Sequence, residues 1–285
     1  YSGDSSPSFS RDVSQNLELP GAQRLEVALP LRRPWGEDVR HGIKLDVTAN
    51  AGSHSATDQK EFVIQEIRRL SSPPVIDGDL VEWIDKQPTM TDLVPELFNP
   101  ALYGGESDLS GAAWIAWDAD FFYFALLAKD DRQEFSQAPT VWDFDSLQMG
   151  FDFGADTPAQ KGYDDLNDME LEVARMRDGS IFLAGMPYPS GRPEEPLIEG
   201  ARVAIRPMPE SGEIAYEIAL PWATLPLPAP PREGTLFAFN FILNDNDGAG
   251  RRGWLEWTPG IGWGKEPSRF TRLWLLDTWG RLEPR

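Results

Sequence analysis

Residues 111–129 read GAAWIAWDADFFYFALLAK, with two apolar runs on either side of Asp118-Ala119-Asp120. Short polar breaks between aromatic-rich runs are typical of hairpin turns, so this stretch predicts two antiparallel strands. Residues 146–153, SLQMGFDF, then alternate strictly between apolar and small or polar side chains. A two-residue period places successive side chains on opposite faces of a strand, so one face is expected to lie on a core.

Further strand-like runs follow at short intervals, separated by Gly, Pro, Asn and Asp. They cover residues 168–177, 181–184, 201–206, 213–220, 236–243, 253–257 and 270–276. Only residues 79–86 and 222–225 have a briefly helical pattern. About ten strands over about 200 residues predict an all-β fold, an antiparallel β-sandwich of the jelly-roll-like kind.

The N-terminal part has a different composition. Residues 1–16 are rich in Ser, Asp and Gly, and we expect a flexible lead-in. Strand-like runs at 25–31, 43–49 and 62–67 make 17–72 a short β-rich extension, either part of an immunoglobulin-like domain or strands docked on the main domain. Pro73-Pro74 interrupts strands and helices alike, so the sandwich is expected over 73–285.

The charge excludes several functions. Lys+Arg 26 against Asp+Glu 46 leave a formal net charge of −20. A chain this acidic is repelled by phosphate backbones and anionic lipids, so we expect neither nucleic-acid binding nor membrane insertion. Cys 0 removes disulfides, thiolate metal sites and cysteine nucleophiles.

Catalytic groups are scarce in the predicted sandwich. Both histidines, His41 and His54, lie in the N-terminal part, so the sandwich has no imidazole base of its own. Glu170 and Glu172 project from one face of a predicted strand, and paired carboxylates can hydrolyse glycosides. The simpler interpretation of a Glu-x-Glu pattern is a solvated sheet face.

Acidic loops suggest calcium without locating it. Residues 244–248, NDNDG, resemble the start of a calcium loop, but the rest of the EF-hand pattern is missing and an Asx-rich hairpin turn explains them. Other acidic clusters lie at Asp130-Asp131 and at Asp143 and Asp145. A structural Ca²⁺ is therefore considered, with its ligands left open, and no nucleotide cofactor is expected.

Two tryptophans differ from the others. Trp142 precedes a strand, and Trp263 lies in PGIGWGK, a Gly-rich loop that offers no regular packing. A large aromatic side chain on a loop is usually covered by a ligand or a partner. Core packing is expected for those inside or beside strands, which are Trp114, Trp117, Trp222, Trp254, Trp257 and Trp274.

Several segments, taken in order, resemble the family 9 carbohydrate-binding modules. They are PVIDGDLVEW at 74–83, WIAWD at 114–118 with FFYF at 121–124, WDFDSLQ at 142–148, EIALPW at 217–222, FNF at 239–241, LEW at 255–257 and PSRF at 267–270. The resemblance covers about residues 73–276 and rests on the order and spacing of these pieces.

The resemblance implies a sandwich in which Trp142 and Trp263 clamp the end of a saccharide chain. Gln148 and Glu172, with Glu170 beside them, are the implied hydrogen-bonding residues. It further implies a non-catalytic, secreted module linked to a catalytic domain in a protein that degrades polysaccharides. The net charge of −20 favours a neutral oligo- or polysaccharide.

The hydrogen-bonding set departs from well-studied relatives. Gln148 stands where they have a carboxylate, Glu172 and Ala174 stand where they have Arg and Asn, and Gly260-Ile261-Gly262 replaces an Asn-rich stretch. The identity of the sugar therefore does not follow from the resemblance.

Three other functions stay open. The carboxylate pair would make the protein an enzyme acting on a polysaccharide. Some similar sandwiches hold b-type haem for electron transfer, and the methionines that could ligate iron are Met149, Met169, Met176 and Met186. A structural spacer would place the loop tryptophans against a neighbouring domain.

Overall fold

The computed structural model describes residues 40–51, 54–84, 86, 88–91, 93–97, 103–137, 140–163, 167–185 and 199–277. The chain divides into two compact units, Tyr1–Asp38 and Val39–Arg285. The expected lead-in at 1–16 and the expected strand at 25–31 lie outside the described residues. None of the helices within the described ranges is long and apolar enough to cross a membrane.

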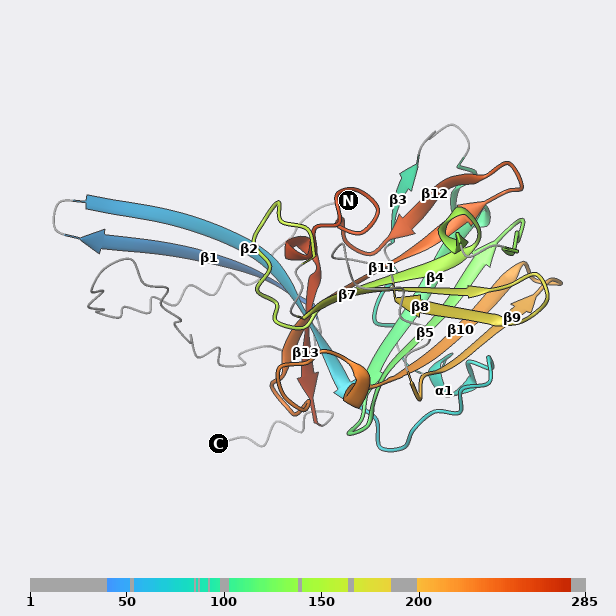
Figure 1. Cartoon of the computed structure of the whole chain (residues 1–285), viewed down its shortest axis with the longest axis horizontal. Coiled ribbons are helices and arrows are strands. Elements are labelled where there is room, and N and C mark those ends of the chain that lie inside the picture. The colour runs from blue at the N-terminus through green and yellow to red at the C-terminus, as the bar shows by residue number, and fades with distance from the viewer. Residues whose placement is uncertain are drawn as a thin grey trace. The chain divides into compact units, whose positions relative to one another are not determined.

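Strands dominate the second unit, which confirms the all-β prediction (Figure 1). The strands are β1 (Arg40–Ala51), β2 (His54–Arg69), β3 (Val94–Leu97), β4 (Leu109–Trp117), β5 (Phe121–Asp130), β6 (Ser146–Asp152), β7 (Asp168–Arg175), β8 (Ile181–Gly185), β9 (Arg202–Met208), β10 (Glu213–Pro221), β11 (Leu236–Asn246), β12 (Arg251–Glu256) and β13 (Thr271–Leu276). The helical segments are short: α1 (Val81–Ile84), η2 (Gly105–Ser107), η3 (Val141–Asp143), η4 (Trp222–Thr224) and η5 (Pro267–Arg269).

The strands run in the order β8-β7-β6-β11-β13-β2-β4-β5-β10-β9. The predicted hairpin at residues 111–129 is formed by β4 and β5, with Trp117 paired to Phe122 across the turn. Neighbours along this order are antiparallel except at β2, which runs parallel to β13 on one side and to β4 on the other. β2 therefore joins the two halves of the sandwich.

Aromatic side chains from both halves fill the space between them. Phe122 of β5 lies 5.6 Å from Phe151 of β6, and Phe124 of β5 lies 4.9 Å from Phe241 of β11, measured between ring centroids. These edge-on contacts bring facing strands together over one core. The tryptophans expected in the core are buried, except that Trp274 is only partly buried; the buried ones are Trp114, Trp117, Trp222, Trp254 and Trp257.

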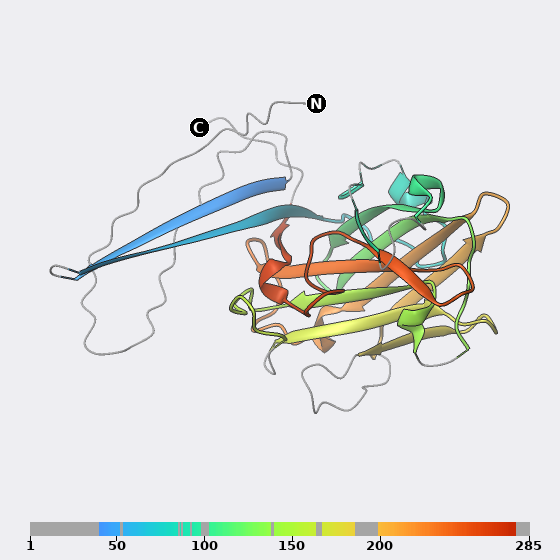
Figure 2. The same cartoon turned by 90° about the horizontal axis from the view of Figure 1, so that it is seen from above.

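The N-terminal hairpin extends further than the apolar pattern predicts. The expected strands at 43–49 and 62–67 lie in β1 and β2, but β2 already begins at His54, inside the polar stretch between them. Backbone pairing with β1 supports these residues regardless of side-chain polarity. From Ser55 to Val63, β2 pairs with β1 alone among the described strands, and only its end at 64–69 enters the sandwich (Figures 1 and 2).

Candidate functional site

The polar face of β6, β7, β11 and β12 carries the predicted hydrogen-bonding residues. Gln148 on β6 pairs with Glu172 on β7 and with Ile242 on β11, and Ile242 pairs in turn with Glu256 on β12. The alternation predicted for residues 146–153 is confirmed, because Leu147, Met149 and Phe151 point into the core. Gln148 and Glu172 therefore lie side by side on the opposite face.

Glu170 and Glu172 point away from the core as predicted, but a solvated face is the wrong interpretation of them. Glu170 is 0% exposed and Glu172 is 4% exposed. A second apolar cluster covers this face; its members are Tyr163, Ala238, Ile242, Trp254, Ile261 and Phe270. Tyr163 comes from the connection that leads into β7 and Ile261 from the loop after β12, and these segments shield the carboxylates from water.

The covered face holds a connected set of buried polar groups. Glu170 Oε1 accepts hydrogen bonds from Gln148 Nε2 at 2.8 Å and from Lys265 Nζ at 2.6 Å. On the other side of Gln148, Asn244 Nδ2 donates to Gln148 Oε1 at 3.4 Å and to Ser146 Oγ at 2.9 Å. Because buried polar groups are costly unless paired, this network fixes its side chains in place.

Trp263 lies on the loop after β12 and is 56% exposed. Its ring packs against Trp254, which is 1% exposed, at a centroid distance of 5.2 Å and an angle of 55°. The loop approaches Trp254 so closely that a Cβ at Gly262 would lie 2.1 Å from the Trp254 ring. Gly262 therefore allows the backbone to lie against the indole that supports Trp263.

Arg251 and Lys265 are among the charged residues of this region that were not predicted. The guanidinium of Arg251 lies 4.3 Å from the centroid of the Trp254 ring, and it contacts Asn244 Oδ1. Burial lowers the pKa of Arg251 to about 10, although the negative charges of Asp143 and Glu170 act in the opposite direction. No local sequence pattern marks either residue, and only their three-dimensional contacts distinguish them from the other lysines and arginines.

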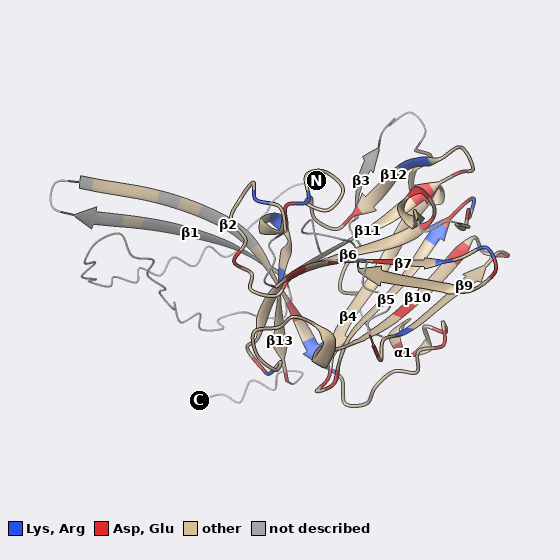
Figure 3. Cartoon of the chain, in the orientation of Figure 1, with Lys and Arg blue, Asp and Glu red and all other residues tan. Residues whose placement is uncertain are grey.

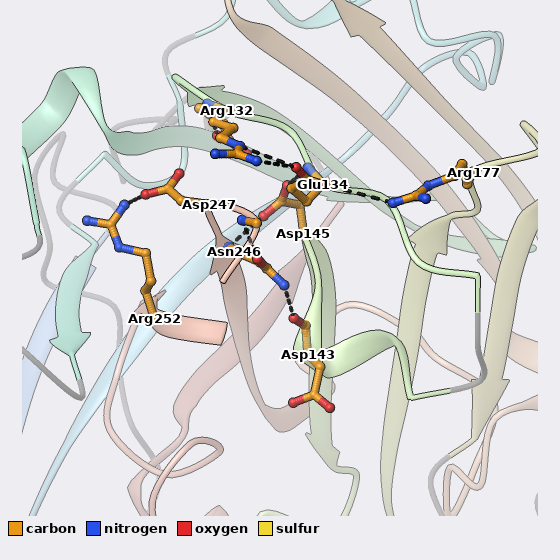
Figure 4. Close-up of polar contacts among 10 residues, drawn as sticks. Arg132, Glu134, Asp143, Asp145, Arg177, Asn246, Asp247 and Arg252 are labelled. Atoms are coloured by element: carbon orange, nitrogen blue, oxygen red, sulfur yellow. Dashed lines mark hydrogen bonds and ion pairs between the residues drawn. The ribbon is translucent and has the colours of Figure 1, made fainter. Parts of the chain in front are cut away.

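Trp142 is half-buried in η3, the short turn before β6. Side chains hold this turn on both sides: Ser146 Oγ donates to the carbonyl oxygen of Val141 at 2.9 Å, and Asn246 Nδ2 donates to that of Asp143. The Trp142 turn is thus tied to β6 by Ser146 and to the β11–β12 hairpin by Asn246, whose contact with Asp143 is shown in Figure 4.

An aspartate cluster lies at the end of the sheet where β11 and β12 meet. Its members are Asp108, Asp130, Asp131, Asp145, Asp245 and Asp247. Asp130, Asp145 and Asp245 are each at most 2% exposed. Asp145 Oδ1 accepts from the backbone N–H of Asn246 at 2.9 Å, and Oδ2 accepts from that of Glu134 (Figure 4). Burial raises the pKa of Asp130 and of Asp245 to about 6.

This cluster offers a metal-ligating geometry. One carboxylate oxygen from each of Asp130, Asp245 and Asp247 lies within 4.8 Å of the others, and Asp108, Asp131 and Asp247 form a second such group. The carboxylate of Asp245 accepts no hydrogen bond from any residue in the described part of the chain. The start of β12 brings cations to the same end (Figure 3), where Arg252 pairs with Asp247 and, at 3.4 Å, with Asp108.

Most of these aspartates are visible in the sequence as separate acidic clusters. Asp130, Asp131, Asp145, Asp245 and Asp247 lie on three stretches of chain that the fold brings together. Asp108 was not predicted, because a lone aspartate at the start of β4 carries no signal in one sequence. The stretch NDNDG at 244–248 lies at the β11–β12 hairpin, as the turn interpretation predicted.

Of the methionines of the haem hypothesis, Met149 and Met169 lie on the neighbouring strands β6 and β7, and Met176 forms an isolated bridge with Ser136. Met149 is fully buried among core phenylalanines and leucines, and Met169 packs against the same cluster from its edge. Met186 lies outside the described residues.

Comparison with known proteins bears on the fold and the family. The profile of a family described as carbohydrate family 9 binding domain-like matches residues 76–278. A search of curated proteins found no match.

Solved structures with the same fold include a carbohydrate binding module family 9 from Caldicellulosiruptor kristjanssonii. In complex with cellotriose it is 18% identical, covering 78% of this chain and 98% of that one, with a TM-score of 0.54. Its complex with glucose is 19% identical over 77% of this chain and 100% of that one, with a TM-score of 0.53. A putative carbohydrate-binding protein from Bacteroides uniformis is 13% identical over 75% and 99%, with a TM-score of 0.50.

Proposed function

The chain belongs to the carbohydrate family 9 binding domain-like family, and from this we propose that it is a non-catalytic module that binds a neutral saccharide at the Trp142 and Trp263 loops. The exposed indole of Trp263 carries the proposal. A side chain of this size is 56% exposed, yet its position is fixed by the buried Trp254 beneath it. Such a rigid, uncovered aromatic surface suits a ligand with an apolar face.

A pyranose has the matching chemistry. Its axial C–H groups form a flat apolar face that stacks on an indole, and its hydroxyls point outward toward polar side chains. Polar groups lie beside the Trp254 ring that supports Trp263: the Arg251 guanidinium lies over that ring and contacts Asn244. Trp142, on a turn that is tied to the same sheet, is proposed as the second aromatic contact.

The proposal extends to the setting of the module. A saccharide-binding module without a catalytic centre holds an attached enzyme near its polymer, so we propose that it acts outside the cell, linked to a catalytic domain that degrades a polysaccharide. The solved relatives bound to cellotriose and glucose support neutral β-glucan-type ligands as the first probes.

A structural Ca²⁺ is proposed at the aspartate cluster. Calcium prefers carboxylate oxygens, and Asp130, Asp245 and Asp247 offer three of them within reach of one ion. The Asp245 carboxylate supports this choice, since it is 2% exposed and receives no hydrogen bond from the described residues. An ion bound there would offset part of the local negative charge and stabilise the end of the sheet that carries the Trp142 turn.

The function is tested by a screen of the protein on immobilised neutral mono- and oligosaccharides, with reducing-sugar release measured in parallel. We expect binding without hydrolysis. Absence of binding to every saccharide would contradict the proposal. Sugar release that disappears in a Glu172→Gln variant would instead make the protein an enzyme.

A further inference from the structure

Lys265 joins the Trp263 loop to the sheet beneath it. It follows Trp263 by two residues, and its ammonium group lies 2.6 Å from Glu170 Oε1. The Lys265 side chain is 24% exposed and that of Glu170 is 0% exposed, so the pair is shielded from water on the sheet side. A buried carboxylate of this kind needs a cation beside it, because an unpaired buried charge is costly.

The backbone of Lys265 adopts a conformation that the surrounding contacts must hold. Its φ is 48°, in the left-handed region that non-glycine residues seldom adopt. The neighbouring residue is also held, because Glu266 Oε1 accepts a hydrogen bond from the backbone N–H of Gln160 at 3.0 Å. A strained conformation persists only where several contacts determine it together.

From Glu170 a chain of buried hydrogen bonds runs to the other tryptophan. Gln148 donates to Glu170, Asn244 donates to both Gln148 and Ser146, and Ser146 donates to the carbonyl oxygen of Val141. Glu170, Asn244 and Ser146 are 0% exposed, and Gln148 is 3% exposed. Val141 is the residue before Trp142, so the chain begins beside one aromatic segment and ends beside the other.

Glu170 is therefore buried and contacted by groups of the protein itself. Its Oε1 already accepts from a lysine and a glutamine, and the loop that carries Lys265 lies across it. We propose that Glu170 is a positioning residue. Its ion pair with Lys265, called the latch below, holds the Trp263 loop in a fixed position relative to the Trp142 turn. This inference rests on the proposed function for its ligand, but the latch itself is a property of the ligand-free protein.

The first experiment measures hydrogen exchange of the backbone amides at residues 260–266 in the absence of any ligand. Lys265→Met and Glu170→Gln are each expected to speed exchange there, and the double variant is expected to be no faster than the faster single variant. Lys161→Met, an exposed lysine on the neighbouring loop, is the control and is expected to leave the exchange unchanged. Exchange that stays at the parent rate in Lys265→Met would overturn the latch.

The second experiment uses cellotriose as the probe and measures Kd by calorimetry. A latch predicts that Lys265→Met and Glu170→Gln weaken binding equally, by about tenfold, and that the double variant is no weaker. The reciprocal variant, Glu170→Lys with Lys265→Glu, is expected to recover part of the affinity. A carboxylate that contacts the sugar directly predicts the opposite, a loss in Glu170→Gln with full affinity in Lys265→Met.

The two proposals fail in different ways. A parent protein that binds no saccharide contradicts the proposed function, whereas the exchange measurement still decides whether the latch exists. A parent that binds cellotriose, with unchanged Kd in Lys265→Met, overturns the latch and leaves the function intact.

Discussion

Trp254 and Trp263 are neighbouring tryptophans with opposite environments. The former is 1% exposed, and the latter is 56% exposed although the two rings lie in contact. The sequence allowed this distinction, because one lies in an alternating strand and the other in a Gly-rich loop. It did not reveal Arg251 or Lys265, since their roles depend on contacts with β7 and β11 across the sheet.

The contrast predicts different effects on stability. Trp254→Ala is expected to lower the free energy of unfolding by about 3–5 kcal/mol, because it empties a site in the cluster that covers the sheet. Trp263→Ala is expected to change it by less than about 0.5 kcal/mol, as an exposed side chain should. Urea denaturation measures both, and equal losses would show that Trp263 is a packing residue and not a ligand surface.

The loop between β12 and β13 is the element that shapes the site. Gly260-Ile261-Gly262, which departs from the Asn-rich stretch of relatives, has a steric explanation here. A Cβ at Gly260 would lie 2.8 Å from the carbonyl oxygen of Glu266, and one at Gly262 would overlap the Trp254 ring. The glycines thus allow the loop to pack closely on the polar face of the sheet.

Gly262→Ala is expected to displace the loop from Trp254. The protein should lose about 1–3 kcal/mol of stability, as overpacked sites do, and its affinity for saccharide should fall. Gly162→Ala is the matched control, because its Cβ would meet only the carbonyl oxygen of Lys265 at 3.7 Å. Thermal unfolding and calorimetric titration of the two variants test this. Identical behaviour of the two would show that the close approach at Gly262 has no functional consequence.

At the level of strands, periodicity predicted which face a residue occupies but not what covers that face. The alternation along β7 was correct, and yet Glu170 and Glu172 are buried because Tyr163, Ile261 and Phe270, which lie outside the strands, pack above them. The parallel pairing of β2 with β13 and β4 was also beyond the sequence. Each of these features depends on contacts between segments far apart in the chain, which no local pattern encodes.

The whole molecule has a formal net charge of −20, and part of its negative charge is gathered in the aspartate cluster. Burial raises the pKa of Asp130 and Asp245 to about 6 and that of Asp145 well above its ordinary value, so the folded state holds protons more tightly than the unfolded chain. The resulting stabilisation is complete below about pH 4, the pKa range of unfolded aspartates, and is lost as the pH rises through about 6.

The upward direction of these pKa shifts predicts how stability responds to pH and calcium. Without divalent cations, lowering the pH from 7 to 5 should raise the Tm of the parent relative to that of Asp245→Asn. At pH 7, Ca²⁺ should raise the Tm of the parent, because it binds the deprotonated carboxylates, and at pH 5 this rise should shrink. Differential scanning calorimetry in EDTA and in CaCl₂ measures both. A Tm that is insensitive to Ca²⁺ at pH 7 would contradict the proposed calcium site.

The central claim is that this family 9-like sandwich binds a saccharide through its loop tryptophans. Its most direct test is a calorimetric titration of cellotriose into the parent protein and into the Trp142→Ala and Trp263→Ala variants. The account predicts measurable binding by the parent and a loss of about thirtyfold in affinity for each variant, as is common when an aromatic anchor is truncated. Variants that bind cellotriose as tightly as the parent would contradict it.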